Sequence, residues 1–169
     1  MMKNNPEKIL VIQTAFLGDV ILTTPLVKAL REIYPQSFIS VLLIPQTAEV
    51  FKNNPHINQL ILYDKKGKQR GVKSFFKLVK FLKRQNFDLA IIPHRSLRSA
   101  LLAYLSKIPQ RIGFHTSGGS FLYTDEVTYK TDIHEIDRNL SLLSPLGHNI
   151  NNIKPFQRRR NTSSPLYRD

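Results

Sequence analysis

The sequence contains no cysteine and no tryptophan. Without cysteine the chain cannot form a disulfide, a thiolate metal site or a cysteine nucleophile, and this composition fits a reducing compartment. The sequence also lacks any apolar run near the roughly 20 residues that a membrane-spanning helix needs. Its first residues, MMKNNP, lead into an apolar strand pattern rather than into the apolar core of a signal peptide. We therefore expect a cytoplasmic protein that does not span a membrane.

Acidic residues are scarce, and the scarcity is local. The chain has 25 Lys or Arg against 12 Asp or Glu, which gives a formal net charge of +13. Residues 65–84 hold nine Lys or Arg and no acid, and residues 150–169 hold five Lys or Arg against one Asp. The positive charge is therefore a property of two segments rather than of the whole surface.

The length of 169 residues fits one domain with a buried core, and 41% hydrophobic residues favour a folded chain. Apolar runs alternate with helical patterns, which predicts an α/β, Rossmann-like parallel sheet with helices on both faces. The predicted strands cover residues 8–13, 37–44, 59–63, 88–92, 111–114 and 121–128. The predicted helices cover residues 18–34, 46–52, 72–84, 96–106 and 134–146. Residues 1–147 would form this domain, and residues 148–169 are predicted to be a basic, disordered tail.

Pro25 lies inside the first predicted helix, and we expect it to kink that helix or to delay its start. At the other end of the domain, Gly147 follows the last predicted helix. A glycine at this position is typical of a helix C-cap.

The turn between the first strand and the first helix carries a carboxylate, Asp19, directly after Gly18. Parallel sheets bind ligands at the carboxyl ends of their strands, so this turn lies at the expected ligand edge. Two interpretations of Asp19 remain open. It could be a helix-start residue that interacts with the positive end of the helix dipole, or a general base that takes a proton from a substrate hydroxyl.

A second polar cluster follows the fourth predicted strand and meets the same edge of the sheet. Its side chains could bind a phosphate or a carboxylate through paired guanidinium hydrogen bonds. The alternative is a solvated helix start, with a serine as the N-cap. The cluster consists of His94, Arg95, Ser96 and Arg98. Arg111, before the fifth strand, is expected to form a structural ion pair.

Several other motifs carry less weight. The sequence has no Gly-x-Gly-x-x-Gly fingerprint and no Walker A motif. The segment His134–Arg138 begins like a zinc-protease helix but has arginine where the second histidine is needed, so we expect no metal site. The Gly118–Gly119 loop could approach a phosphate, although a simple turn explains it as well.

The helix predicted over residues 72–84 has two contrasting faces. An apolar face for packing is predicted from Val72, Phe75, Phe76, Val79 and Leu82. A cationic face is predicted from Lys73, Lys77, Lys80 and Arg84. The cationic face could be merely solvated, or it could meet anionic lipid headgroups or nucleic-acid phosphates. Nucleic acid is not expected as a partner, because no recognition motif accompanies the charge.

Four motifs occur in one order along the chain: KILVIQTAFLGDVILTTP at 8–25, PHRS with RSA at 93–100, RIGF at 111–114 and HEIDRNL at 134–140. Together they resemble the lipopolysaccharide heptosyltransferases of glycosyltransferase family nine, over roughly residues 7–147. The resemblance implies a GT-B protein with two Rossmann-like domains, of which this chain carries the N-terminal, acceptor-binding one.

The resemblance also implies a reaction: metal-independent, inverting transfer of heptose from ADP-heptose to the inner core of lipopolysaccharide, without a cofactor. It makes Asp19 the base. It makes Thr14, Gly18 and the cluster His94, Arg95, Ser96 and Arg98 the substrate contacts, the arginines facing the acceptor's Kdo carboxylates and phosphates. The cationic face Lys73, Lys77, Lys80 and Arg84 would then meet the anionic inner face of the cytoplasmic membrane, which makes the protein peripheral there.

Members of the resembled family continue with a second, donor-binding domain after the HEIDRNL helix. Here only the basic segment follows, so the expectation is a truncated chain that lacks the donor site and is inactive alone. The alternative function is a noncatalytic module that binds lipopolysaccharide precursors or an anionic membrane, and a basic nucleic-acid-binding protein is a weaker third.

Overall fold

The computed structural model describes residues 5–148. Its six strands are β1 (Lys8–Ile12), β2 (Phe38–Leu43), β3 (Gln59–Leu62), β4 (Leu89–Ile92), β5 (Gln110–Phe114) and β6 (Asp125–Val127). Its α-helices are α1 (Leu17–Ile21), α2 (Thr24–Ile33), α3 (Val72–Gln85), α4 (Leu97–Leu105) and α5 (Glu135–Ser141). Three 3₁₀ helices are η1 (Pro45–Val50), η2 (Ser120–Leu122) and η3 (Ser144–Leu146).

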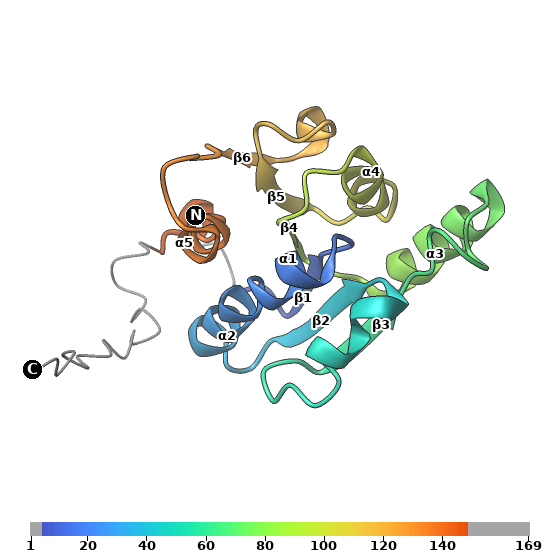
Figure 1. Ribbon diagram of the computed structural model, residues 1–169, viewed down its shortest axis with the longest axis horizontal. Coiled ribbons are helices and arrows are strands. Elements are labelled where there is room, and N and C mark those ends of the chain that lie inside the picture. Colours follow the sequence, from blue (N-terminus) through green and yellow to red (C-terminus); the bar gives the residue numbers. More distant parts are fainter. Residues whose placement is uncertain (1–4, 149–169) are drawn as a thin grey trace, which may run out of the picture.

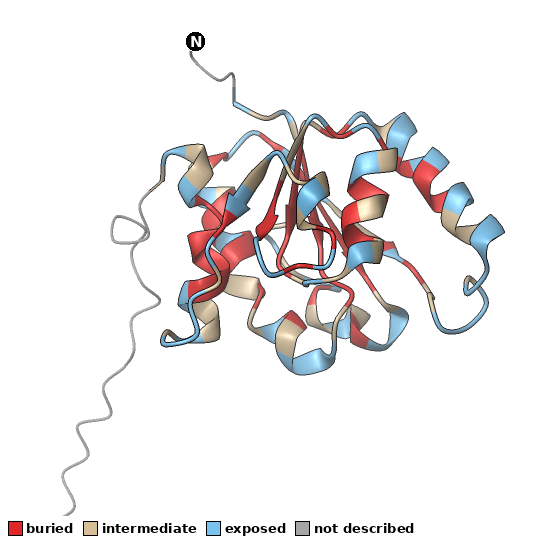
Figure 2. Ribbon diagram, turned by 90° about the horizontal axis from the view of Figure 1, so that it is seen from above, coloured by how far each residue is buried: buried red, intermediate tan, exposed pale blue. Residues whose placement is uncertain are grey.

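All strand pairs are parallel, and the strand order is β3-β2-β1-β4-β5-β6. Figure 1 shows the sheet with its helices on both sides. Figure 2 shows the strands as the most fully buried part of the chain, between two layers of helices. This is the Rossmann-like α/β architecture that the sequence predicts, and the prediction is confirmed.

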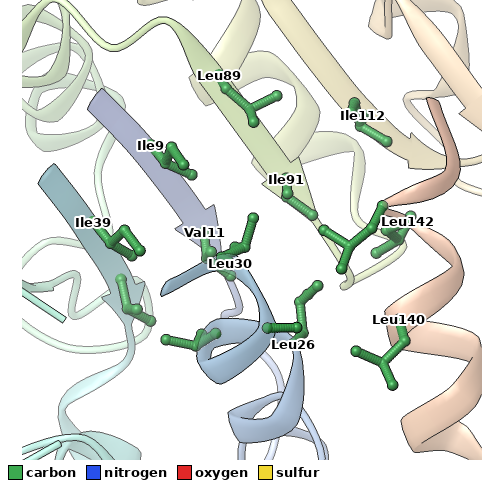
Figure 3. Close-up of a cluster of buried hydrophobic side chains, with 14 of the residues drawn as sticks. Ile9, Val11, Leu26, Leu30, Ile39, Leu89, Ile91, Ile112, Leu140 and Leu142 are labelled. Atoms are coloured by element: carbon green, nitrogen blue, oxygen red, sulfur yellow. The ribbon is translucent and has the colours of Figure 1, made fainter. Parts of the chain in front are cut away.

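The two faces of the sheet bury alternate residues of each strand, as the pleat requires. Ile9 and Val11 pack against Leu26 and Leu30 of α2 and against Leu140 of α5 (Figure 3). The intervening residues of β1 face the opposite way, where α3 and α4 cover the sheet. Strands buried on both faces explain why the sequence shows continuous apolar runs rather than strict alternation.

The first predicted helix is two helices. α1 ends at Ile21, and α2 begins at Thr24 with Pro25 in its first turn, where the missing N–H of proline is harmless. The prediction that Pro25 interrupts residues 18–34 is therefore confirmed. Gly147 also behaves as predicted: its φ of 84° caps η3 in the left-handed conformation.

Other boundaries differ from the predictions. Of the strand predicted at 121–128 only Asp125–Val127 is extended, because Ser120–Leu122 forms a 3₁₀ turn. The helix predicted at 134–146 ends at Ser141, and the helix predicted at 46–52 is the 3₁₀ helix η1. The predicted tail falls, from residue 149 on, outside the described residues.

The apolar face predicted for α3 is partly wrong. Leu78, Val79 and Leu82 are buried against the sheet, but Val72 is 72% exposed and Phe76 is 54% exposed. Val72 lies at the first turn of α3, and Phe76 follows it by four residues, so the two share a side that turns away from the sheet. Helical periodicity correctly placed Val79 and Leu82 on the buried face of α3. It wrongly included Val72 and Phe76 in that face.

Within residues 5–148 no helix is long and apolar enough to cross a membrane.

Candidate active site

The carboxyl ends of β1 and β4 form the topological switch point of the sheet. These two central strands are hydrogen-bonded neighbours, and the chain leaves β1 towards β2 on one side and leaves β4 towards β5 on the other. In open α/β sheets such a point opens a crevice for ligands. Thr14 follows β1 and His94 follows β4, so the two predicted clusters meet here.

Buried polar side chains hold the turn after β1. Gln13 donates from Nε2 to Thr23 Oγ1 at 2.9 Å, and Thr23 Oγ1 in turn donates to the main-chain oxygen of Asp19 at 2.8 Å. Gln13 and Thr23 are both buried. The backbone of Asp19 is therefore tied to the end of β1, while its side chain is only half-buried and remains accessible.

Gly18, beside Asp19, has open space around its Cα. A Cβ built at this position meets no other heavy atom within 4 Å. The main chain is therefore accessible to a bound molecule at Gly18, as the prediction of a substrate contact requires.

Thr14 connects three other segments of the chain. Its hydroxyl lies 3.2 Å from His94 Nδ1 and 3.4 Å from Ser99 Oγ of α4. Lys65, from the loop after β3, donates to the Thr14 carbonyl at 2.8 Å and to its hydroxyl at 3.3 Å. The structure thus brings predicted Thr14 and His94 together and adds Lys65 and Ser99.

Burial and neighbouring charges lower the pKa of two members of this cluster. Burial lowers the pKa of the His94 imidazole, the Lys65 charge lowers it further, Asp19 opposes this by raising it, and Arg95 lowers it again. Burial likewise lowers the pKa of Lys65, and the neighbouring charges of Lys66 and Arg98 add to the effect. The Asp19 carboxylate is therefore one of the charges that act on the His94 ring.

Arg98 is held between aromatic rings. Its guanidinium lies 5.4 Å from the Tyr63 ring and 5.3 Å from the Phe75 ring. Its Nε and the Tyr63 hydroxyl are buried without a hydrogen-bond partner among the described residues. Because this Nε is shielded from solvent, an anion could pair only with the terminal nitrogens of the Arg98 guanidinium.

Arg95 is exposed, and its guanidinium lies 4.2 Å from the centre of the Tyr129 ring. Ser96 stands at the N-cap position of α4, but its side chain makes no capping hydrogen bond. The interpretation of Ser96 as a helix N-cap is thus correct for its position. Its hydroxyl, however, does not accept the hydrogen bond that an N-cap side chain usually accepts.

A cavity of about 360 Å³ opens beside the Gly18–Asp19 turn. Its lining residues come from α1, from η1 and from the loop after β3: Phe16, Leu17, Ile44, Gln46, Thr47, Asp64, Lys65 and Lys66. Phe16 is 74% exposed, and the Lys66 ammonium lies 5.5 Å from its ring. A lining that combines apolar side chains with two lysines and one carboxylate suits a ligand that is partly apolar and partly charged.

The HEIDRNL motif is structural within the described residues. His134 caps α5 by accepting a hydrogen bond from the Ile136 N–H, and Arg138 is buried and paired with Glu135. Arg138 also donates to the carbonyls of Lys130 and Ile133. No cluster of His, Asp or Glu suited to a metal ion occurs among residues 5–148.

Arg111 forms no ion pair with a described residue, so that prediction is wrong. It donates instead to the carbonyls of Leu122 and Ile108, and its guanidinium lies 5.4 Å from the Tyr104 ring. These contacts tie β5 to the turn before β6, which leaves Arg111 in a structural role.

The Gly118–Gly119 loop packs against α4. A Cβ at Gly119 would lie 2.4 Å from Ala100 Cβ, so the glycine permits a close approach of two backbones. The turn interpretation therefore accounts for Gly119.

Sequence reasoning missed Gln13, Thr23, Lys65, Ser99 and Tyr63 as parts of the site. Lys65 lay within a basic segment whose charge was visible but whose contact with Thr14, 51 positions away, was not. Ser99 belongs to the RSA motif at 98–100, but no local signal showed that its hydroxyl would approach Thr14, 85 positions away.

Fold and site together define an α/β protein of the Rossmann-like class, with a carboxylate and cationic groups at its switch point. Residues 75–161 match the model of glycosyltransferase family 9, the heptosyltransferases. The chain belongs to glycosyltransferase family 9.

Individual proteins that resemble this chain are also heptosyltransferases or family 9 glycosyltransferases. The chain is 34% identical over 139 residues to lipopolysaccharide heptosyltransferase 3 of Escherichia coli K12, covering 77% of this chain and 40% of that protein. A family 9 glycosyltransferase structure from Veillonella parvula matches with a TM-score of 0.78 and 28% identity, over 85% of this chain and 42% of that one. The Escherichia coli heptosyltransferase WaaC with ADP shares the fold at a TM-score of 0.71 and 17% identity, over 84% of this chain and 48% of that one. The chain thus spans less than half the length of these proteins.

Proposed function

We propose that this chain supplies the acceptor-binding half and the general base of a heptosyltransferase acting on the inner core of lipopolysaccharide. The observation that carries the proposal is the position of Asp19, on the short helix that follows β1 at the switch point of a family 9 fold, where its charge acts on the His94 ring. The names of the relatives, which are lipopolysaccharide heptosyltransferases, support the acceptor class. The ADP bound to WaaC supports an ADP-sugar donor.

In the proposed reaction an acceptor hydroxyl attacks the anomeric carbon of ADP-heptose from the face opposite the ADP group. The carboxylate of Asp19 takes the hydroxyl proton as the new carbon–oxygen bond forms, and the bond to ADP breaks with its electron pair. The anomeric centre is inverted. We expect neither a metal ion nor a cofactor, and the donor site would lie in a second domain.

The cationic groups of the crevice suit an anionic acceptor. Arg98 lies between Tyr63 and Phe75 with no hydrogen bond from its Nε to a described residue, and Arg95 is exposed. Both can pair with carboxylates or phosphates on the acceptor sugar, such as those of Kdo. Ser96, whose hydroxyl caps nothing, is available to the same ligand.

The experiment compares Asp19→Asn with the unchanged chain, using ADP release from ADP-heptose in the presence of lipopolysaccharide acceptors that carry no heptose, one heptose or two heptoses. The chain is assayed alone and with the C-terminal half of the Escherichia coli relative added in trans. Loss of a general base should lower kcat by about 10²–10⁴-fold and leave acceptor binding almost unchanged.

Asp137→Asn is the matched control, because Asp137 is an exposed carboxylate on α5. A fully active Asp19→Asn protein would refute the role of Asp19. Absence of both transfer and acceptor binding by the unchanged chain, in either arrangement, would refute the proposed function.

We further propose that the protein works as a peripheral protein on an anionic membrane surface, with α3 towards the lipid. The predicted cationic face is exposed at Lys73, Lys77, Lys80 and Arg84. Exposed Val72 and Phe76 lie among these cations, and such a mixture favours the headgroup region. Each cation near the surface contributes about 1 kcal/mol.

Sedimentation with phosphatidylglycerol vesicles, compared with phosphatidylcholine vesicles, tests this orientation. The triple change Lys73→Gln, Lys77→Gln and Lys80→Gln should release the chain at moderate salt, and Phe76→Ser should weaken binding on its own. The triple change Lys28→Gln, Lys52→Gln and Lys107→Gln removes the same charge from other exposed positions. Equal losses in both triple variants would show that total charge, and not α3, attracts the vesicles.

A further inference from the structure

Three side chains converge on the hydroxyl of Thr14. Lys65 Nζ lies 3.3 Å away, His94 Nδ1 3.2 Å away and Ser99 Oγ 3.4 Å away. Thr14 is itself buried. A hydroxyl has one hydrogen and two lone pairs, so three partners use its whole hydrogen-bonding capacity.

The direction of each bond follows from the chemistry of the partners. The Lys65 ammonium can only donate, so it takes one lone pair of Thr14 Oγ1. Ser99 is buried, and Thr14 is the one hydrogen-bond partner of its hydroxyl among the described residues. The Ser99 hydrogen is therefore satisfied only when it too points to Thr14. Both lone pairs of Thr14 are then used, and its own hydrogen goes to His94 Nδ1.

The reverse order is less favourable. If His94 Nδ1 carried the proton and donated to Thr14, the Thr14 hydrogen would turn to Ser99. The hydrogen of the buried Ser99 hydroxyl would then have no acceptor, a loss that disfavours this arrangement about fivefold or more.

We infer that Lys65 and Ser99, acting through Thr14, hold His94 in the neutral tautomer with its proton on Nε2. Nδ1 accepts the hydrogen of the Thr14 hydroxyl and Nε2 carries its own hydrogen, so neither nitrogen offers a free lone pair to a bound molecule. His94 instead offers a hydrogen-bond donor to the crevice. A carboxylate or hydroxyl oxygen on the bound molecule is the matching acceptor.

This inference rests on the proposed function only in naming that molecule as the sugar acceptor. It divides the chemistry of the crevice between two residues: His94 orients an oxygen of the ligand, and Asp19 alone takes the proton. Thr14, Lys65 and Ser99 are positioning residues. Burial and the charges of Lys65 and Arg95, which together outweigh Asp19, support the neutral ring.

Imidazole tautomers are measured directly by long-range ¹H–¹⁵N correlation spectra of the ¹⁵N-labelled chain, above the ordinary histidine pKa of 6.5. The spectrum of His94→Gln identifies the His94 signals among the five histidines. We expect a protonated Nε2 and an unprotonated Nδ1, in at least about fivefold excess over the other form. A His94 ring that carries its proton mainly on Nδ1 would overturn the inference.

Two variants test the positioning role. Thr14→Val removes the hydroxyl with little change of shape, and Lys65→Met frees a lone pair of Thr14 that could accept from Nδ1–H. Both should raise the Nδ1–H population, whereas Thr14→Ser and the exposed-lysine control Lys28→Met should not. If Thr14→Val and Lys65→Met leave the tautomer unchanged in a folded chain, these residues do not set it. Either result is independent of the outcome for Asp19→Asn.

Discussion

The side-chain amide of Asn139 donates a hydrogen bond to the carbonyl oxygen of Leu22 at 3.1 Å, across 117 positions of sequence. Leu22 lies in the break between α1 and α2, where regular helical hydrogen bonding is interrupted. Asn139 is buried on α5 and so ties that helix to the break. One residue of the HEIDRNL motif therefore helps to hold the short helix that carries Asp19.

We expect Asn139→Ala to destabilise the fold by about 1–3 kcal/mol, because the Leu22 carbonyl loses its partner. Urea unfolding followed by circular dichroism measures the change. Asp132→Ala, at an exposed position before α5, is the control and should stay within about 0.5 kcal/mol of the unchanged chain. An Asn139→Ala protein as stable as this control would show that the hydrogen bond from Asn139 to Leu22 does not stabilise the fold.

Because the space around Gly18 is open, a substitution there can test substrate binding without disturbing the fold. Gly18 lies in α1, and a Cβ there meets no protein atom, so Gly18→Ala should fold at least as stably as the unchanged chain. If a substrate approaches the main chain at this point, the added methyl group should still weaken acceptor binding.

The measurement for Gly18→Ala combines the melting temperature with the dissociation constant for heptose-free lipopolysaccharide. We expect an unchanged or higher melting temperature together with binding about tenfold weaker or more, the cost of a modest steric clash with the ligand. Unchanged affinity would remove Gly18 from the list of substrate contacts.

Two adjacent glycines should respond differently to the same substitution. Gly119→Ala places a Cβ 2.4 Å from Ala100 Cβ, and we expect a loss of about 1–3 kcal/mol from overpacking. Gly118→Ala meets nothing closer than 3.8 Å and should be nearly neutral. Thermal unfolding of both variants measures this difference, and we expect the lower melting temperature for Gly119→Ala. Similar melting temperatures would contradict the close packing of this loop on α4.

Much of the fold could be predicted because it depends on local patterns. The apolar runs Ile9–Ile12 and Leu89–Ile92 identify the central strands, and Pro25 identifies the helix break. Strand ends in a parallel sheet then place Thr14 and His94 at one edge without knowledge of tertiary contacts.

The remaining features depend on contacts that no local pattern contains. The approach of Lys65 to Thr14 requires the loop after β3 to reach past the end of β2 to the end of β1. The exposure of Val72 depends on where α3 leaves the sheet, and the carbonyl contacts of Arg111 depend on the turn before β6. In each case the sequence gives the residue type, and the tertiary fold decides its partner.

His94 also predicts how stability should vary with pH. Its pKa in the folded chain lies below the ordinary value of 6.5, chiefly because of burial. Between those two values the unfolded chain binds more protons than the folded chain, so the free energy of unfolding rises with pH across this window. The contribution of the neutral His94 ring to stability is therefore fully present above pH 6.5. It is lost as the pH falls towards the folded-state pKa.

Urea unfolding at a series of pH values through this window, at constant ionic strength, measures the slope. His94→Gln keeps an acceptor for the Thr14 hydroxyl but cannot be protonated, so its stability should depend less on pH than that of the unchanged chain. His56→Gln, which replaces a histidine in the loop before β3, is measured in parallel as a histidine substitution away from Thr14. If His94→Gln shows the same slope as the unchanged chain, the His94 ring does not produce the pH dependence. The lowered pKa of His94 would then no longer support a neutral ring that accepts the Thr14 hydrogen at Nδ1.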